Sequence, residues 1–83
     1  MAINHVTFQR IRLAGQYAPE EAQLAFFDGN LVAVLVCIDD KDVPPERHGW
    51  CLEIGFGPCR GEGILLPTLE FVEAWIRDRT GPN

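Results

Sequence analysis

Eight consecutive apolar residues are the feature that most constrains how this chain can fold. They run from Leu31 to Ile38 and read LVAVLVCI. A strand with one side in water usually alternates apolar and polar residues, whereas a strand buried on both sides is apolar throughout. The run is much shorter than the roughly 20 residues that a membrane-spanning helix needs. It therefore predicts the central strand of a sheet, with cover required on both faces.

A hairpin turn precedes this strand. Asp28, Gly29 and Asn30 separate it from another apolar run, which is a strong short-range signal for two antiparallel strands. We therefore expect a β-hairpin within residues 21–40. Strict alternation would place Val32, Val34, Val36 and Ile38 on one face of the second strand, and Leu31, Ala33, Leu35 and Cys37 on the other.

Two further strands are expected, one on each side of the hairpin in the sequence. Residues 4–13 (NHVTFQRIRL) contain β-branched and aromatic residues without Gly or Pro. Their apolar residues change parity, which indicates either a bulge near Gln9 and Arg10 or partial cover on both faces. Residues 50–56 (WCLEIGF) alternate, which places Trp50, Leu52, Ile54 and Phe56 on one face.

One helix is expected, over residues 69–79. Thr68 is suited to cap its N-terminus, and Gly81 follows its end. Glu73 and Arg77 are spaced for an ion pair one turn apart. Its apolar stripe consists of Leu69, Val72, Trp75 and Ile76, with Phe71 at the edge. The predicted fold is α+β, with the order β-β-β-β-α and the C-terminal helix packed on one face of a four-stranded antiparallel sheet.

The length of 83 residues fits a single small α+β domain spanning residues 1–83. One helix covers only one face of a sheet, so the other face needs a different cover. The candidates are the loops at 14–20, 39–49 and 57–67, a second copy of the chain in a homodimer, or a different protein. The edge strand at 4–13 offers a further route, the addition of a strand from another chain.

The charge of the chain restricts its partners. Seven basic and twelve acidic residues give a net charge of −5. This opposes direct binding to nucleic acid or to an anionic membrane and favours a partner with a basic surface. The three cysteines show no metal-ligand spacing, and the N-terminus lacks the pattern of a signal peptide. We therefore expect a reducing, cytoplasmic location.

Three segments could be chemical sites, but for each of them the sequence fits a purely structural role better than a chemical one. The glycine-rich segment Gly55 to Gly63, with Cys59 and Arg60, resembles neither a dinucleotide-binding loop nor a P-loop. Zinc binding by His48, Cys51 and Cys59 lacks the usual paired spacing. The acidic run at residues 39–42 lacks the glycine and distal glutamate of a calcium loop. We therefore predict no catalytic residue, metal or cofactor.

The leading functional hypothesis is a small, acidic, non-catalytic interaction protein that acts as a regulator or inhibitor. A more specific version is an immunity-like or anti-defence protein whose carboxylates occupy a basic groove that otherwise holds nucleic-acid phosphates. The alternative is a ligand-binding, anion-binding or enzymatic module built on the glycine-rich segment. The residues expected to contact the partner are Asp39, Asp40, Asp42, Glu46, Phe27, Trp50 and Arg60.

Overall fold

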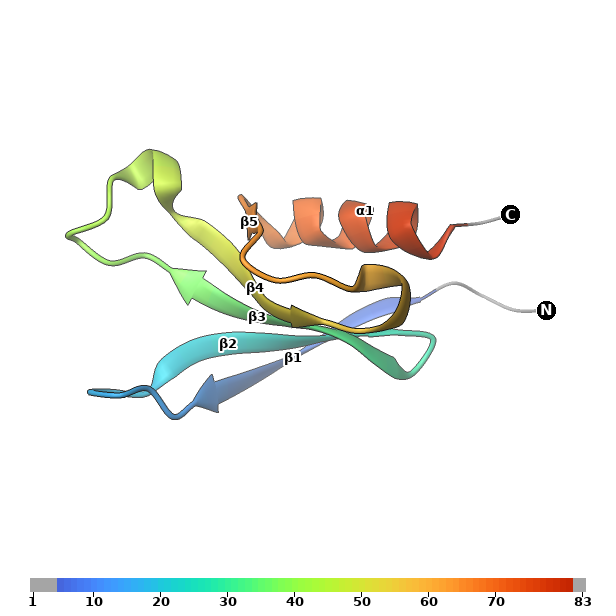
Figure 1. The fold of residues 1–83 in the computed structure, drawn as a ribbon, viewed down its shortest axis with the longest axis horizontal. Coiled ribbons are helices and arrows are strands. Elements are labelled where there is room, and N and C mark those ends of the chain that lie inside the picture. The colour runs from blue at the N-terminus through green and yellow to red at the C-terminus, as the bar shows by residue number, and fades with distance from the viewer. Residues whose placement is uncertain (1–4, 82–83) are drawn as a thin grey trace.

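The computed structural model describes residues 5–81 and has an α+β fold (Figure 1). Its strands are β1 (Val6–Leu13), β2 (Glu20–Phe27), β3 (Asn30–Ile38), β4 (Gly49–Gly55) and β5 (Leu65–Leu66). Its helices are the 3-10 turns η1 (Pro45–Arg47) and η2 (Gly57–Cys59) and the α-helix α1 (Leu69–Thr80). The α+β class is confirmed. The predicted number of strands was one too low, because Leu65 and Leu66 pair with β4 before Pro67 ends the pairing.

The strands within residues 5–81 form one antiparallel sheet in the order β1-β2-β3-β4-β5. The uninterrupted apolar strand β3 occupies the centre, as its sequence predicts. Ala33 and Leu35 are fully buried, and Val32 and Val36 are each only 5% exposed. Residue 4, the first of the predicted N-terminal strand, lies outside the described part of the chain.

The hairpin turn between β2 and β3 forms where the sequence predicts it. Phe27 pairs with Asn30, which leaves a two-residue loop of Asp28 and Gly29. Both loop residues have positive φ, 52° and 86°, as a type I′ turn requires. The Asp28 carboxylate also accepts a hydrogen bond from the backbone N–H of His5 at 2.8 Å. The turn is thereby tied to the residue that precedes β1.

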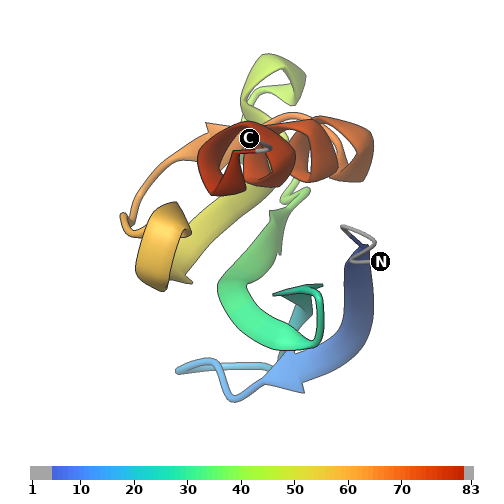
Figure 2. The same ribbon diagram turned by 90° about the vertical axis from the view of Figure 1, so that its right-hand side faces the viewer.

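The C-terminal helix also forms as predicted. Thr68 caps it, because its hydroxyl oxygen accepts a hydrogen bond from the Phe71 backbone N–H at 3.0 Å. Val72 and Ile76 are fully buried and belong to a core that includes Leu35 and Leu52 from the sheet. Figure 2 shows α1 lying over the twisted sheet on the side of β3 and β4. The helix therefore covers one face of the sheet, as expected.

Strict alternation is wrong for β3 and β4, because two register shifts interrupt the pairing. One lies between Ala25 and Phe26, opposite β3, and it places Val32 in the core while leaving Leu31 38% exposed. The other lies between Val34 and Leu35 and makes Glu53 an extra residue of β4. As a result Leu52 is fully buried, whereas Ile54 and Phe56 are exposed.

Of the two explanations offered for the parity change in β1, the bulge near Gln9 and Arg10 does not occur, since β1 and β2 pair without any register shift. The other explanation agrees with the structure. Val6 and Phe8 on one face, and Ile11 and Leu13 on the other, are all half-buried. Both sides of β1 are therefore partly covered.

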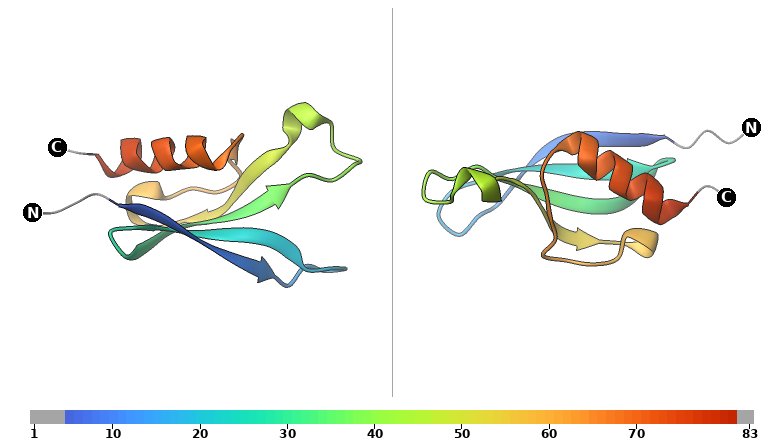
Figure 3. Two further views of the ribbon diagram at one scale, coloured as in Figure 1. Left: turned by 180° about the vertical axis from the view of Figure 1, so that it is seen from behind. Right: turned by 90° about the horizontal axis from the view of Figure 1, so that it is seen from above.

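The side of the sheet away from α1 is here called the open face. Its paired residues form four rows across the strands. The turn η2 contacts α1, and the loops at 14–19 and 39–48 extend beyond the end of the sheet (Figures 1 and 3). Exposure on this face is uneven, because Ala22 and Val36 are buried whereas Leu31, Ile54 and Leu65 are 38%, 43% and 42% exposed. The rows are Thr7, Phe26 and Leu31; Gln9, Leu24, Val34 and Ile54; Ile11, Ala22, Val36, Cys51 and Leu65; and Leu13 and Glu20.

Candidate interaction surface

An acidic groove lies where β2 begins and β3 ends. It is open to solvent and has a volume of about 690 Å³. Five carboxylates line it, and Lys41 supplies the only cationic side chain in its lining. This acidic groove is lined by Pro19, Glu20, Glu21, Cys37, Ile38, Asp39, Asp40, Lys41, Asp42 and Val43.

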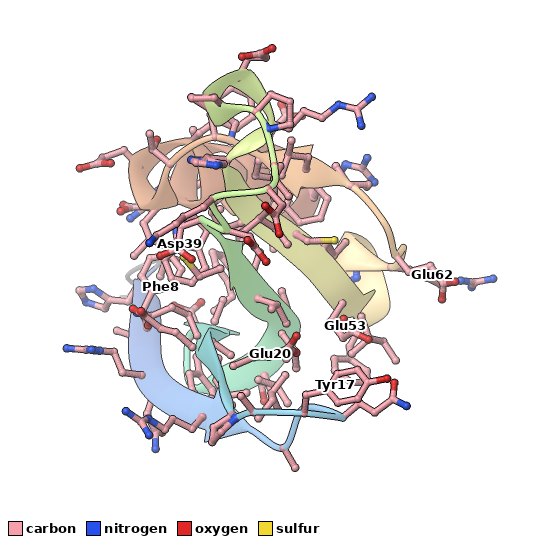
Figure 4. The ribbon with its side chains drawn as sticks, turned by 90° about the vertical axis from the view of Figure 1, so that its left-hand side faces the viewer. Phe8, Tyr17, Glu20, Asp39, Glu53 and Glu62 are labelled. Atoms are coloured by element: carbon pink, nitrogen blue, oxygen red, sulfur yellow. The ribbon has the colours of Figure 1, made fainter. Side chains whose placement is uncertain are left out.

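The pairing of β2 with β3 explains why acids from two separate segments of the chain line the same groove. Ala22 pairs with Val36, so the residues before Ala22 run alongside those after Val36. This brings Glu20 and Glu21 close to the aspartates that follow Ile38. Figure 4 views this end of the molecule, with Glu20 and Asp39 labelled. The groove is therefore a consequence of hairpin register.

Hydrogen bonds fix the shape of the segment after β3. The Asp40 carboxylate accepts from the Asp42 backbone N–H at 3.0 Å, and the Asp40 carbonyl accepts from the Val43 N–H at 3.0 Å. Nε2 of His48 lies 2.7 Å from the Val43 carbonyl oxygen and 3.1 Å from that of Asp40. A carbonyl oxygen can only accept, so Nε2 carries the hydrogen. His48, at the other end of the loop between β3 and β4, thereby holds the acidic segment in place.

The cysteine in the groove responds to the surrounding negative charge. Burial raises the pKa of the Cys37 thiol, and the carboxylates of Asp39 and Glu21 raise it further. Glu21 acts on this thiol from β2, and Asp39 acts on it from the segment that follows β3. A raised pKa keeps the thiol protonated at neutral pH, which makes Cys37 a poor nucleophile.

The residues predicted to contact a partner do not form one surface. Asp39, Asp40 and Asp42 line the groove, whereas Glu46 lies on η1 and is outside the groove lining. Trp50 pairs with Cys37 near the same end, but it packs against the core. Phe27 also packs against the core, beside the hairpin turn at the opposite end of the sheet. Arg60 follows η2, near that same opposite end, and is exposed.

Sequence reasoning missed Glu20 and Glu21 as part of this surface. Neither is among the residues expected to contact the partner. The signal was available, because a two-residue turn at Asp28-Gly29 fixes which residues of the two strands lie side by side. Extending that register to the strand ends brings Glu20 and Glu21 near Asp39.

The glycine-rich segment has a structural role in this fold. Gly55 lies so close to the Cys59 carbonyl oxygen that a β-carbon at Gly55 would be 1.8 Å from it. Cys59 is fully buried in the core, and burial raises the pKa of its thiol more than Arg79 lowers it. Such a thiol is neither accessible nor ionised, so the geometry does not favour a nucleophile at Cys59.

The groups proposed for metal binding do not converge. Across residues 5–81, no three His, Cys, Asp or Glu side chains are arranged to hold a metal ion. His48 is engaged with backbone carbonyls, and Cys59 lies in the core.

Within residues 5–81, no helix is both long and apolar enough to cross a membrane.

Known proteins offer no guide to the groove. No protein-family model matches the chain, and neither a curated protein nor a solved structure shows significant similarity to it.

Proposed function

We propose that this chain is a small, non-catalytic interaction module, a regulator or inhibitor that docks its acidic groove on a basic surface of another protein. The observation that carries the proposal is the composition of the groove lining, with five carboxylates against one ammonium group. Unbalanced charge of one sign steers a partner of opposite charge and raises its rate of association.

The floor of the groove adds contact area. Ile38, Val43 and Cys37 are half-buried and lie among the acids. An apolar floor with a charged rim is the usual composition of a protein-binding patch. A free phosphate or nucleic acid would be repelled by the rim, so the surface fits a cationic protein.

The most specific form of the proposal is mimicry of nucleic-acid phosphates, as an immunity-like or anti-defence inhibitor would use. Carboxylates held on a short stiff loop can pair with lysines and arginines that otherwise contact phosphates. The three cysteines are all free thiols, which fits the proposed cytoplasmic location.

The proposal is tested by neutralising the groove and comparing capture of partners. The groove variant carries Asp39→Asn, Asp40→Asn and Asp42→Asn, which removes three charges while keeping the side-chain oxygen that caps the Asp40 turn. The matched control carries Glu62→Gln, Glu70→Gln and Asp78→Asn, three exposed acids outside the groove lining. Each protein is immobilised and used to capture partners from an extract of the source cells.

The expected result is a captured protein that the wild type and the control retain and the groove variant loses. Its binding should weaken steeply with salt, and heparin, a polyanion, should release it by competing for the basic surface. Capture that survives in the groove variant, or that is insensitive to both salt and heparin, contradicts the proposal.

A further inference from the structure

The edge strand β1 has free backbone groups along its outer side. It is the last strand at one end of the sheet order, and within residues 5–81 no strand pairs with its outer side (Figure 2). The carbonyl oxygen of His5 accepts a hydrogen bond from the Asp28 N–H at 2.8 Å, so the backbone of His5 faces the hairpin. In an antiparallel pair, the backbone groups of successive residues face alternately toward and away from the partner strand. The residues whose backbone groups point away from β2 are therefore Val6, Phe8, Arg10 and Arg12.

The opposite edge of the sheet is closed. There β5 has only two residues, and it is followed by Pro67, which has no N–H group. The Leu52 N–H donates to the Ile64 carbonyl at 2.7 Å, and the Gly63 N–H donates to the Leu52 carbonyl at 2.8 Å, so the chain after η2 pairs with β4. Short strands, prolines and bulges usually protect an edge. In contrast, β1 has eight residues, no proline and no register shift against β2, so its edge is open to an added strand.

Two exposed arginines lie along the second half of β1. Arg10 and Arg12 are two residues apart, so both lie on the side of the sheet that faces α1. The helix does not bury them, because Val6 and Phe8 pack against the core whereas both arginines are exposed. Arg10 lies 3.9 Å from Glu21, with the two side chains 78% and 50% exposed, and such a contact contributes little. Among residues 5–81, Arg12 has neither an ion pair nor a hydrogen bond. Both guanidinium groups are therefore available to a ligand.

A recess of about 270 Å³ accompanies these arginines, and its lining consists of Arg10, Ile11, Arg12 and Glu21. A strand that joins an edge gains affinity from main-chain hydrogen bonds and specificity from pockets for its alternate side chains. Guanidinium groups favour carboxylates, because the two groups pair through parallel hydrogen bonds. Glu21 does not block such a pair. An added strand would lie about 10 Å from β2, on the other side of β1, since neighbouring strands are about 4.8 Å apart.

We propose that β1 binds an extended acidic segment of another protein as an added antiparallel strand. The segment forms backbone hydrogen bonds with the outward-facing residues of β1. It places carboxylates on alternate residues opposite Arg10 and Arg12, where opposite charges across strands stabilise the pairing. Apolar residues of the segment lie opposite Phe8 and Val6. This site is separate from the acidic groove, because none of the aspartates of the groove lines the recess.

The same arginines disfavour a second copy of the chain at this edge. Antiparallel pairing of β1 with β1 of another copy would bring Arg10 and Arg12 of both copies onto one side of a single seam. Like charges on neighbouring strands destabilise their pairing, and charged side chains commonly prevent edges from joining one another. The charge of this edge therefore favours an acidic strand over self-association.

The test uses a synthetic peptide and the full chain labelled with nitrogen-15. The peptide is Glu-Thr-Glu-Thr-Val-Thr-Val, acetylated and amidated, which aligns antiparallel with β1 from Arg12 to Val6. One control peptide has lysine in place of both glutamates. Another has N-methylvaline at the fifth position, opposite Phe8, which keeps the side chain and removes an N–H that would bond to β1. Amide chemical shifts are followed during titration to about 5 mM peptide.

Two double variants of the protein test the contribution of the arginines. The edge variant carries Arg10→Gln and Arg12→Gln. The matched control carries Arg47→Gln and Arg60→Gln, which neutralises two exposed arginines outside β1 and outside the recess. Both variants lose the same charge, so a difference between them reports the position of the arginines. Circular dichroism confirms that each variant is folded.

We expect the acidic peptide to bind with a Kd of about 1 mM or lower, and the largest shifts to occur at the outward-facing amides of β1. The lysine peptide and the edge variant should each weaken binding at least about threefold, and the N-methylated peptide should weaken it at least about tenfold. The matched control should bind like the wild type.

Absence of binding up to about 5 mM overturns the proposal. So does equal affinity for the acidic and lysine peptides, or an edge variant that binds no more weakly than the matched control. Shifts confined to residues outside β1 would place the peptide elsewhere and overturn it as well. Shifts of β1 amides on dilution of the chain alone would show that a second copy occupies the edge, which also contradicts the proposal.

Discussion

Gln23 lies directly opposite Leu35 in the β2–β3 pairing, on the side of the sheet that α1 covers. Leu35 is fully buried and Gln23 is only 6% exposed. In the part of the chain that the structure describes, the side-chain carbonyl oxygen of Gln23 has no hydrogen-bond partner. A buried acceptor without a partner loses its hydrogen bonds to water and forms none within the protein, which lowers the stability of the fold.

Gln23→Met should therefore stabilise the protein. Methionine has nearly the same shape and removes the unpartnered oxygen, and we expect the free energy of unfolding to rise by about 1 kcal/mol. Urea unfolding followed by circular dichroism measures the change. Gln16→Met, at an exposed loop position, should leave stability nearly unchanged. A loss of stability in Gln23→Met would mean that the amide makes an important contact.

The register shift near the hairpin turn gives a second prediction. Leu35→Ala should reduce stability by about 2–5 kcal/mol, because Leu35 is fully buried beside α1. Leu31→Ala should cost about 1 kcal/mol or less, since Leu31 is 38% exposed. Strict alternation predicts similar burial for these two leucines, so equal losses would contradict the shifted register. Measurement at a protein concentration where the chain is monomeric separates folding from association.

These two leucines also show how far the sequence predicts the fold. Local signals identified the hairpin turn, the central strand and α1 with its Thr68 cap, because each depends on neighbouring residues. The bulges depend on how β2, β3 and β4 fit together under the helix, and no local pattern encodes them. The additional strand β5 was missed for a similar reason, since two residues carry almost no strand signal.

The candidate site was predictable in part. Charge along the sequence identified Asp39, Asp40 and Asp42, whose neighbours in space are partly set by the same hairpin. Phe27 and Trp50 were expected at a contact surface, yet both pack against the core. An aromatic residue in an amphipathic strand can face either side, and one bulge reverses the assignment. Charge was therefore a better guide to the surface than aromatic character.

The helix cap gives a third prediction. Thr68→Ala removes the acceptor for the Phe71 N–H and should lower stability by about 1 kcal/mol. For a domain of this size the melting temperature should fall by about 4–8 °C. Thr68→Ser keeps the hydroxyl and should recover most of the loss. If alanine and serine at this position behave alike, the hydroxyl does not stabilise the helix.

The buried thiol of Cys59 gives the last prediction, a loss of stability at alkaline pH. Burial raises its pKa in the folded protein above the ordinary value of 9.0, so the unfolded chain releases this proton at a lower pH than the folded protein does. The stabilisation is fully present below the unfolded pKa and is lost as pH rises through the folded pKa. Between these two values stability falls by up to about 1.4 kcal/mol per pH unit for one proton.

The measurement compares the free energy of unfolding at pH 8 with that at pH 10, about one unit on either side of the ordinary thiol pKa, for the wild type and for Cys59→Ala. The alanine variant should be less stable at both pH values, because it leaves a small cavity in the core. Its loss of stability between them should nevertheless be smaller, since one thiol no longer titrates. Tyr17 and Lys41 remain in both proteins, and Cys37 and Cys51, whose pKa values burial also raises, contribute equally to both. An identical pH dependence in the two proteins would show that Cys59 titrates normally in the fold and is therefore accessible to solvent.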